Sequence, residues 1–225
     1  MNLLEKFEID TKNEHIYEVA FTHASYSTCH ELDYTYERLE FLGDSVLNVV
    51  VSEYLFNKYP DFEEGKLTKL RANYVCQNAL VYYAHELGLK QFIKLVSSGD
   101  VNLTKNEIIS ITADVVESFI GAMFIDQGME FAKDFIAKNI FKYIDEEKIF
   151  FTDYKSAIKE YCDANNLTID YEILKEFGVP HDKTFIVAIL LDGEQLGVGK
   201  GKNKKEGEQA ASKVALERLN IGVIK

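Results

Sequence analysis

The sequence contains no tryptophan, only 2 prolines and only 3 cysteines among its 225 residues. The cysteines are Cys29, Cys76 and Cys162, and their odd number and wide spacing exclude a disulfide framework and a paired-cysteine zinc site. No apolar run approaches the length of a membrane span, and residues 1–10 lack the apolar region of a signal peptide. With 47% hydrophobic residues the chain can still form a sizeable core. We therefore expect a folded cytoplasmic protein with reduced thiols and no membrane contact.

Basic residues are also in deficit, since the net charge is −12. Residues 151–225 carry 11 basic and 12 acidic residues, a net charge of −1. Of the 25 basic and 37 acidic residues in the chain, 14 basic and 25 acidic residues therefore lie in residues 1–150, a net charge of −11. An acidic domain repels a phosphate backbone unless metal ions neutralise it or a basic neighbour attracts the nucleic acid. Without either, the better interpretation is an acidic module that binds proteins.

A run of acids in the first half is the most informative motif. Glu37, Glu40 and Asp44 are spaced by three and four residues, which places them on one face of a helix. Like charges on one stripe repel each other, and a divalent metal with oxygen ligands is the simplest cation that would stabilise them. The alternative is a solvated acidic face. Phe41 borders the acids, however, and an exposed ring of that size suggests a partner surface.

A second acidic pair interrupts an apolar helical run. Asp114 and Glu117 have i, i+3 spacing within residues 111–122. Acids on a largely buried helix are costly unless they are paired or bound to metal. Two such helices packed together would form a carboxylate cluster suited to Mg²⁺.

The apolar periodicity of residues 1–150 predicts an all-helical domain. Pro60, Gly88 and Gly128 mark helix ends. The helices are expected over residues 34–58, 66–87, 107–126 and 129–143. We place this domain at 1–147 and a short linker at 148–152.

After the linker the hydrophobic period changes. Residues 153–165 read as a helix with Asp153 as N-cap, and a final helix is expected over 204–219. Asp192-Gly193 is a hairpin turn signal between two of the strands. The strands are expected over residues 168–177, 183–191 and 195–202. Residues 153–225 thus form an α-β-β-β-α domain, and the fold class is mainly α with a small α+β domain at the end.

The segment from Glu37 to Ser45, ERLEFLGDS, resembles the signature of the ribonuclease III family of double-stranded-RNA endonucleases. Residues 22–25 (THAS), 64–71 and 114–122 resemble other blocks of that family in the same order. The α-β-β-β-α order with lysines at its last helix resembles the family's double-stranded-RNA-binding domain. The resemblance therefore covers nearly the whole chain.

The resemblance implies an Mg²⁺-dependent hydrolase, with Mn²⁺ able to substitute and no nucleotide cofactor. Glu40, Asp44, Asp114 and Glu117 are the expected metal ligands, and Asp44 and Glu117 are also expected to be catalytic. By resemblance, Glu37 and Glu64 complete the catalytic site. The family also implies cleavage of both strands by a homodimer, which leaves 5′-phosphate and 3′-hydroxyl ends. Phe41 is the expected interface residue, and His23 is read as structural.

The expected RNA contacts lie in the second domain. Cations at a helix start oppose the helix dipole, so lysines there suggest that phosphates dock at that end. By resemblance, His181 lies in a loop that enters the RNA minor groove. Lys159 replaces a common glutamine, and Gly207 replaces a common alanine for no reason visible in the sequence. The RNA-binding residues we expect are Lys159, His181, Lys202, Lys204 and Lys205.

Two other functions stay open at this stage. One is a catalytically silent protein that binds duplex RNA, although such a protein would lack one or more acids and all six are present. The other is an acidic interaction module for a basic protein. The sequence does not distinguish ribosomal, messenger and small-RNA precursors as substrates of RNA processing.

Overall fold

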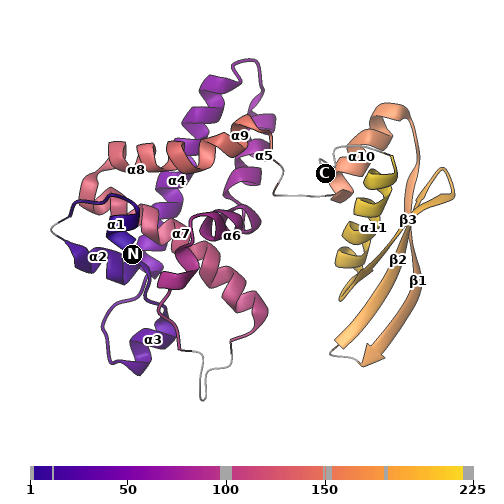
Figure 1. Ribbon diagram of the computed structural model, residues 1–225. Helices are drawn as coiled ribbons and strands as arrows, with labels where there is room; N and C mark the ends of the chain where they lie inside the picture. Colours follow the sequence, from indigo (N-terminus) through magenta and orange to yellow (C-terminus); the bar gives the residue numbers. More distant parts are fainter. Residues whose placement is uncertain are drawn as a thin grey trace. The chain divides into compact units, whose positions relative to one another are not determined.

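The computed structural model describes residues 3–11, 13–96, 103–148, 150, 154–179 and 182–219. The chain divides into two compact units, residues 1–151 and residues 152–225. The first is helical and the second combines helices with a sheet, so the expected fold class is confirmed (Figure 1).

The helical unit is built around one buried helix, α7 (Lys105–Gln127). A capping box starts it, because the Thr104 side chain accepts from the Glu107 backbone N–H and the Glu107 side chain accepts from the Thr104 N–H. Val116, Phe119 and Ile120 along its length are fully buried. The other elements of the unit are α1 (Leu3–Lys6), α2 (Glu14–Ala20), α3 (Ala24–Cys29), α4 (Glu37–Lys58), α5 (Glu64–Val75), α6 (Gln77–Glu86), η1 (Leu89–Phe92), α8 (Met129–Ile136), η2 (Ala137–Phe141) and α9 (Lys142–Asp145).

The expectation that no segment has the length and apolarity of a membrane span is wrong for α7. By length and composition alone this helix could cross a membrane. However, 67% of its most apolar window is buried inside the helical unit. Within the described residues α7 is therefore the core helix of a folded unit, and this position explains its composition.

One helix predicted from the sequence is two separate helices in the structure. Residues 66–87 were expected to form a single helix, but α5 ends at Val75 and α6 begins at Gln77. Between them Cys76 is extended, with φ −71° and ψ 159°. The break lets α5 pack on α4 while α6 packs on α7. No glycine or proline marks the position, so the apolar pattern runs through it without interruption.

The other expected helices of this unit differ from the structure mainly at their ends. The helix expected from residue 34 begins at Glu37, and the helix expected over 129–143 contains a π-helical segment, η2, and continues to Asp145. Gly88 has the left-handed backbone, φ 60°, that ends a helix. The short helices α1, α2 and α3 were not anticipated.

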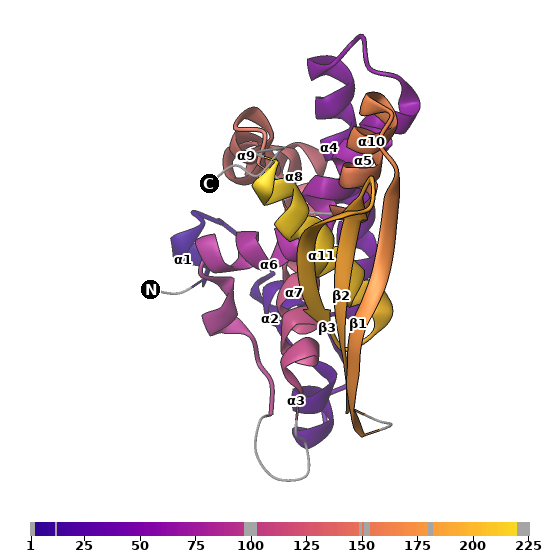
Figure 2. The same ribbon diagram turned by 90° about the vertical axis from the view of Figure 1, so that its right-hand side faces the viewer.

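The second unit is a three-stranded antiparallel sheet with two helices on one face, as Figures 1 and 2 show. The strand order is β1-β2-β3, and the turn at Asp192-Gly193 has positive φ at both residues, as the turn signal predicts. Asp153, the expected N-cap of the first helix, lies outside the described residues. The elements are α10 (Tyr154–Asn165), β1 (Ile169–Val179), β2 (Asp182–Leu191), β3 (Glu194–Gly201) and α11 (Lys204–Arg218).

Glycines let α11 lie directly on the sheet. A Cβ atom at Gly199 would lie 2.1 Å from the backbone nitrogen of Ala211. A Cβ atom at Gly207 would lie 2.6 Å from Cγ2 of the buried Val187. The packing thus explains Gly207, for which the sequence offered no reason: its lack of a side chain allows the first turn of α11 to contact β2.

Candidate active site and nucleic-acid interface

The two acidic motifs meet because α4 and α7 cross at glycines. A Cβ atom at Gly43 would lie 1.7 Å from the backbone oxygen of Glu117. On the facing helix, a Cβ atom at Gly121 would lie 2.2 Å from the backbone oxygen of Leu39. Only glycine allows the two backbones to approach so closely. The crossing therefore fixes the first turns of α4 beside the middle of α7.

Three carboxylates converge at this crossing. One oxygen each of Glu40, Asp114 and Glu117 lies within 4.8 Å of the others. Burial first, and then the charges of Asp44, Glu40 and Asp114, raise the pKa of Glu117 to about 8. Burial, with the charges of Asp114, Glu37 and Asp44, raises the pKa of Glu40 to about 7. Burial also raises the pKa of Asp114. Such crowding is unfavourable for anions and favourable for a bound cation.

Two more predicted site residues border this cluster on α4. Asp44 is exposed one turn after Glu40, and its Oδ1 accepts a hydrogen bond from Asn48 Nδ2 at 2.7 Å. Glu37 is exposed at the start of the helix, and its charge contributes to the raised pKa of Glu40. Neither residue is in the group of three, but both add negative charge to it.

Tyr36, the residue just before α4, bonds to one acid of the cluster, whereas His23 caps a neighbouring helix. The Tyr36 hydroxyl donates to Asp114 Oδ2 at 3.0 Å, a contact that the sequence analysis missed. His23 caps α3, because its Nδ1 accepts from the Ser25 backbone N–H at 3.1 Å. Burial lowers the pKa of His23 even though Glu37 and Asp114 oppose this effect. A capping imidazole fits the structural role expected for His23.

Glu64 is placed elsewhere in the unit. It begins α5, is exposed, and accepts from Thr68 Oγ1 at 2.9 Å. It borders a groove of about 560 Å³ that Leu55 and Phe56 also line. Leu55 follows Glu40 by fifteen residues on the same helix, a separation of about 22 Å at 1.5 Å per residue. Within one chain, the structure therefore does not bring Glu64 to the cluster.

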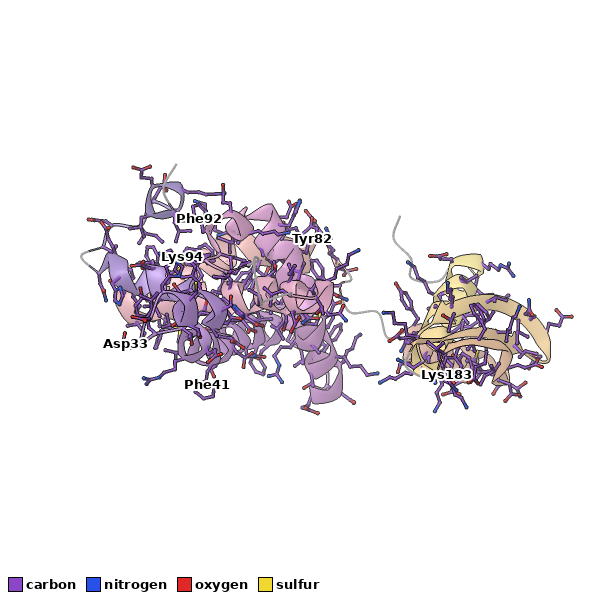
Figure 3. The ribbon with its side chains drawn as sticks, turned by 90° about the horizontal axis from the view of Figure 1, so that it is seen from below. Asp33, Phe41, Tyr82, Phe92, Lys94 and Lys183 are labelled. Carbon is purple, nitrogen blue, oxygen red and sulfur yellow. The ribbon has the colours of Figure 1, made fainter. Side chains whose placement is uncertain are left out.

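Phe41 points away from the helical unit, as Figure 3 shows, and its side chain is 78% exposed. It is the most exposed of the large hydrophobic residues among those described. Figure 3 also shows it on the outer surface of the unit, and an exposed ring of this size suggests a surface that binds a partner.

The predicted RNA contacts on α10 and α11 are exposed. Lys202, Lys204 and Lys205 surround the start of α11, and Lys159 lies on α10. Asn203 caps α11, since its side chain accepts from the Glu206 backbone N–H at 2.9 Å. His181 lies outside the described residues.

The donor set at the crossing fits a hard divalent cation. All its ligands would be carboxylate oxygens, which Mg²⁺ and Mn²⁺ prefer over the nitrogen and sulfur ligands typical of zinc. Among the residues that the structure describes, Glu40, Asp114 and Glu117 form the one such grouping of potential metal ligands. The buried acidic cluster is thus compatible with a divalent metal.

Comparisons with known proteins agree with this arrangement. Residues 13–144 match the ribonuclease-III-like family, and residues 154–219 match the double-stranded RNA binding motif. The chain is 42% identical over 221 residues to ribonuclease 3 of Geobacillus kaustophilus, covering 96% of this chain and 89% of the relative. It is 39% identical over 221 residues to ribonuclease 3 of Listeria monocytogenes, covering 96% of both chains.

A solved structure is similar to the helical unit. The nuclease domain of ribonuclease III from Campylobacter jejuni matches with a TM-score of 0.56 and 38% identity, covering 62% of this chain and 94% of that domain. That domain has a region involved in dimer formation. With an acidic cluster in a matching nuclease unit, followed by a matching RNA-binding unit, the chain belongs to the ribonuclease III family of endoribonucleases.

Proposed function

We propose that this protein is a Mg²⁺-dependent endonuclease that hydrolyses phosphodiester bonds in double-stranded RNA, with Mn²⁺ able to replace Mg²⁺. Its role is the processing of RNA precursors in the cytoplasm. The observation that carries the proposal is the convergence of Glu40, Asp114 and Glu117 at the crossing of α4 and α7. The pKa of Glu117, raised to about 8, indicates a site arranged for a positive charge.

Glu40, Asp44, Asp114 and Glu117 are the residues that would hold the ion. When bound, the metal supplies a water activated for attack and stabilises negative charge on the leaving oxygen. The four carboxylates place negative charge at a fixed point, because two of them lie on α4, two lie on α7, and these helices pack closely. The products expected from this hydrolysis are 5′-phosphate and 3′-hydroxyl ends.

Two sites related by two-fold symmetry are the simplest means of cleaving both strands, and a homodimer provides them. Phe41 is an exposed knob near the start of α4, and the groove lined by Leu55 and Phe56 lies near its end. If α4 packs antiparallel on its copy, the start of one α4 lies beside the end of the other, and Phe41 of one chain enters the groove of the other. Two-fold symmetry then repeats this contact for the second Phe41. Glu64 borders that groove and would then approach the partner's acidic cluster. In this arrangement Glu37 and Glu64 complete the catalytic sites.

The unit of residues 152–225 recruits the substrate. Lysines near the start of α11 meet the phosphates, and backbone N–H groups at that end assist them. Such a domain spans about 16 base pairs and recognises the A-form shape more than the sequence. It offsets the repulsion between RNA and the acidic nuclease unit. We assign these contacts to Lys159, His181, Lys202, Lys204 and Lys205.

Incubation of a long RNA duplex with Mg²⁺, and separately with EDTA, tests the proposal. We expect cleavage in Mg²⁺ and none in EDTA, with binding in both. Asp44→Asn should abolish cleavage and keep binding, whereas Asp134→Asn, an exposed residue on α8, should leave both unchanged. Binding without cleavage by the unmodified protein would identify a catalytically silent RNA-binding protein instead. Full activity of Asp44→Asn would refute the site assignment.

A further inference from the structure

Tyr36 connects three segments that surround the acidic cluster. Its backbone N–H donates to the Thr22 carbonyl at 3.0 Å, and its own carbonyl accepts from the Glu40 N–H at 2.9 Å. Its hydroxyl donates to Asp114 Oδ2 at 3.0 Å. A single residue therefore fixes the first turn of α4, which carries Glu40, and reaches across to Asp114 on α7.

The hydroxyl is a dependable donor at this place. Tyr36 is 4% exposed, so water cannot readily replace the bond. A phenolic hydroxyl has an ordinary pKa of about 10, so the group carries its proton at neutral pH and can donate it in a hydrogen bond. A carboxylate has two oxygens with about four lone-pair sites. The bond from Tyr36 can therefore fix the Asp114 carboxylate and still leave oxygen lone pairs for an ion.

We propose that Tyr36 is a positioning residue of the metal centre, whose hydroxyl holds the Asp114 carboxylate in the orientation in which it joins Glu40 and Glu117 around the ion. The inference rests on the proposed metal-dependent function. Hydrogen bonds to ligating groups commonly set the affinity of a metal site by 10- to 100-fold. Removal of the hydroxyl should therefore weaken metal binding without removing a ligand.

The chain contains a matched control for Tyr36→Phe. Tyr17 is also buried, at 2% exposed, and its hydroxyl donates to Asp126 Oδ2 at 2.7 Å. Asp126 lies on α7 like Asp114, but outside the cluster. Tyr36→Phe and Tyr17→Phe thus remove the same kind of bond from the same helix, and only one of them is at the proposed metal site.

The direct measurement is a titration of the metal-free protein with Mn²⁺. The electron spin resonance signal of free Mn²⁺ reports how much of the ion stays unbound. We expect Tyr36→Phe to weaken Mn²⁺ binding by about 10-fold and to raise the half-saturating Mg²⁺ concentration for RNA cleavage by a similar factor. Saturating Mg²⁺ should restore its cleavage rate, which a misfolded variant would not show. Tyr17→Phe should bind Mn²⁺ like the unmodified protein.

Three results would overturn the inference. They are unchanged Mn²⁺ affinity in Tyr36→Phe, equal weakening in Tyr17→Phe, and a loss of cleavage that Mg²⁺ does not restore. The failure of the proposed function looks different, because then the unmodified protein itself neither binds Mn²⁺ nor cleaves RNA. That result would remove both proposals together.

Discussion

Glu117 should make the metal-free protein less stable as the pH rises. The side chain is 9% exposed, and burial with three neighbouring acids raises its pKa from 4.5 to about 8. In the unfolded chain the carboxyl keeps its ordinary pKa, so the folded state binds more protons between these two values. Stability contributed by this group is therefore present below pH 4.5 and is lost progressively as the pH rises to about 8.

The size of the effect follows from the two pKa values of Glu117. At 1.36 kcal/mol per pH unit, the loss is about 5 kcal/mol over the whole window and about 3.5 kcal/mol between pH 5 and pH 8. Glu40, whose pKa is raised to about 7, titrates in the same range, so the two carboxyls lose their protons as a coupled pair and Glu40 adds to the loss of stability. At 2–4 °C per kcal/mol, the melting temperature should fall by about 10 °C.

Glu117→Gln keeps the shape and removes the charge, so most of this pH dependence should disappear. The assay is thermal unfolding in EDTA followed by circular dichroism, from pH 5 to pH 8. Glu130→Gln, an exposed residue on α8, is the matched control and should behave like the unmodified protein. Mg²⁺ should raise the melting temperature of the unmodified protein at pH 8 and have little effect on Glu117→Gln. Parallel stability curves for the unmodified protein and Glu117→Gln in EDTA would refute the reasoning.

Three further perturbations test the interface, the helix crossing and the RNA contacts. Phe41→Ala should weaken the dimer, as measured by sedimentation equilibrium. Ile109→Ala, which removes another exposed apolar side chain, should leave the dimer unchanged. Equal dimer dissociation constants for Phe41→Ala and the unmodified protein would count against the proposed interface. Gly43→Ala should lower the free energy of unfolding in urea by about 1–3 kcal/mol, although alanine has the better helix propensity, because the added Cβ meets a backbone oxygen. An unchanged urea midpoint would contradict the close crossing of the two helices. Replacing Lys204 and Lys205 together by alanine should weaken the binding of duplex RNA. The slope of log affinity against log salt concentration should fall in magnitude by about 2. A slope equal to that of the unmodified protein would exclude phosphate contacts at these lysines.

Local patterns in the sequence carried much of the fold and the composition of the site. The spacing of Glu37, Glu40 and Asp44 predicts one helical face, because helical periodicity depends only on neighbours along the chain. Asp192-Gly193 predicts its turn for the same reason, since the backbone preference belongs to the two residues themselves. The break at Cys76 had no such signal, because it reflects a change of packing partner between α5 and α6.

The tertiary structure decided which of the acids come together. Their identity and order are written in the sequence, but the distance between α4 and α7 is set by Gly43 and Gly121, whose effect exists only once the two helices cross. The bond from Tyr36 to Asp114 joins residues 78 positions apart, and no local pattern contains it. Glu64 is likewise separated from the cluster by the length of α4. Chemistry was thus specified by residue type and local spacing, whereas convergence was specified by packing, because contacts between distant segments depend on how whole helices fit against each other.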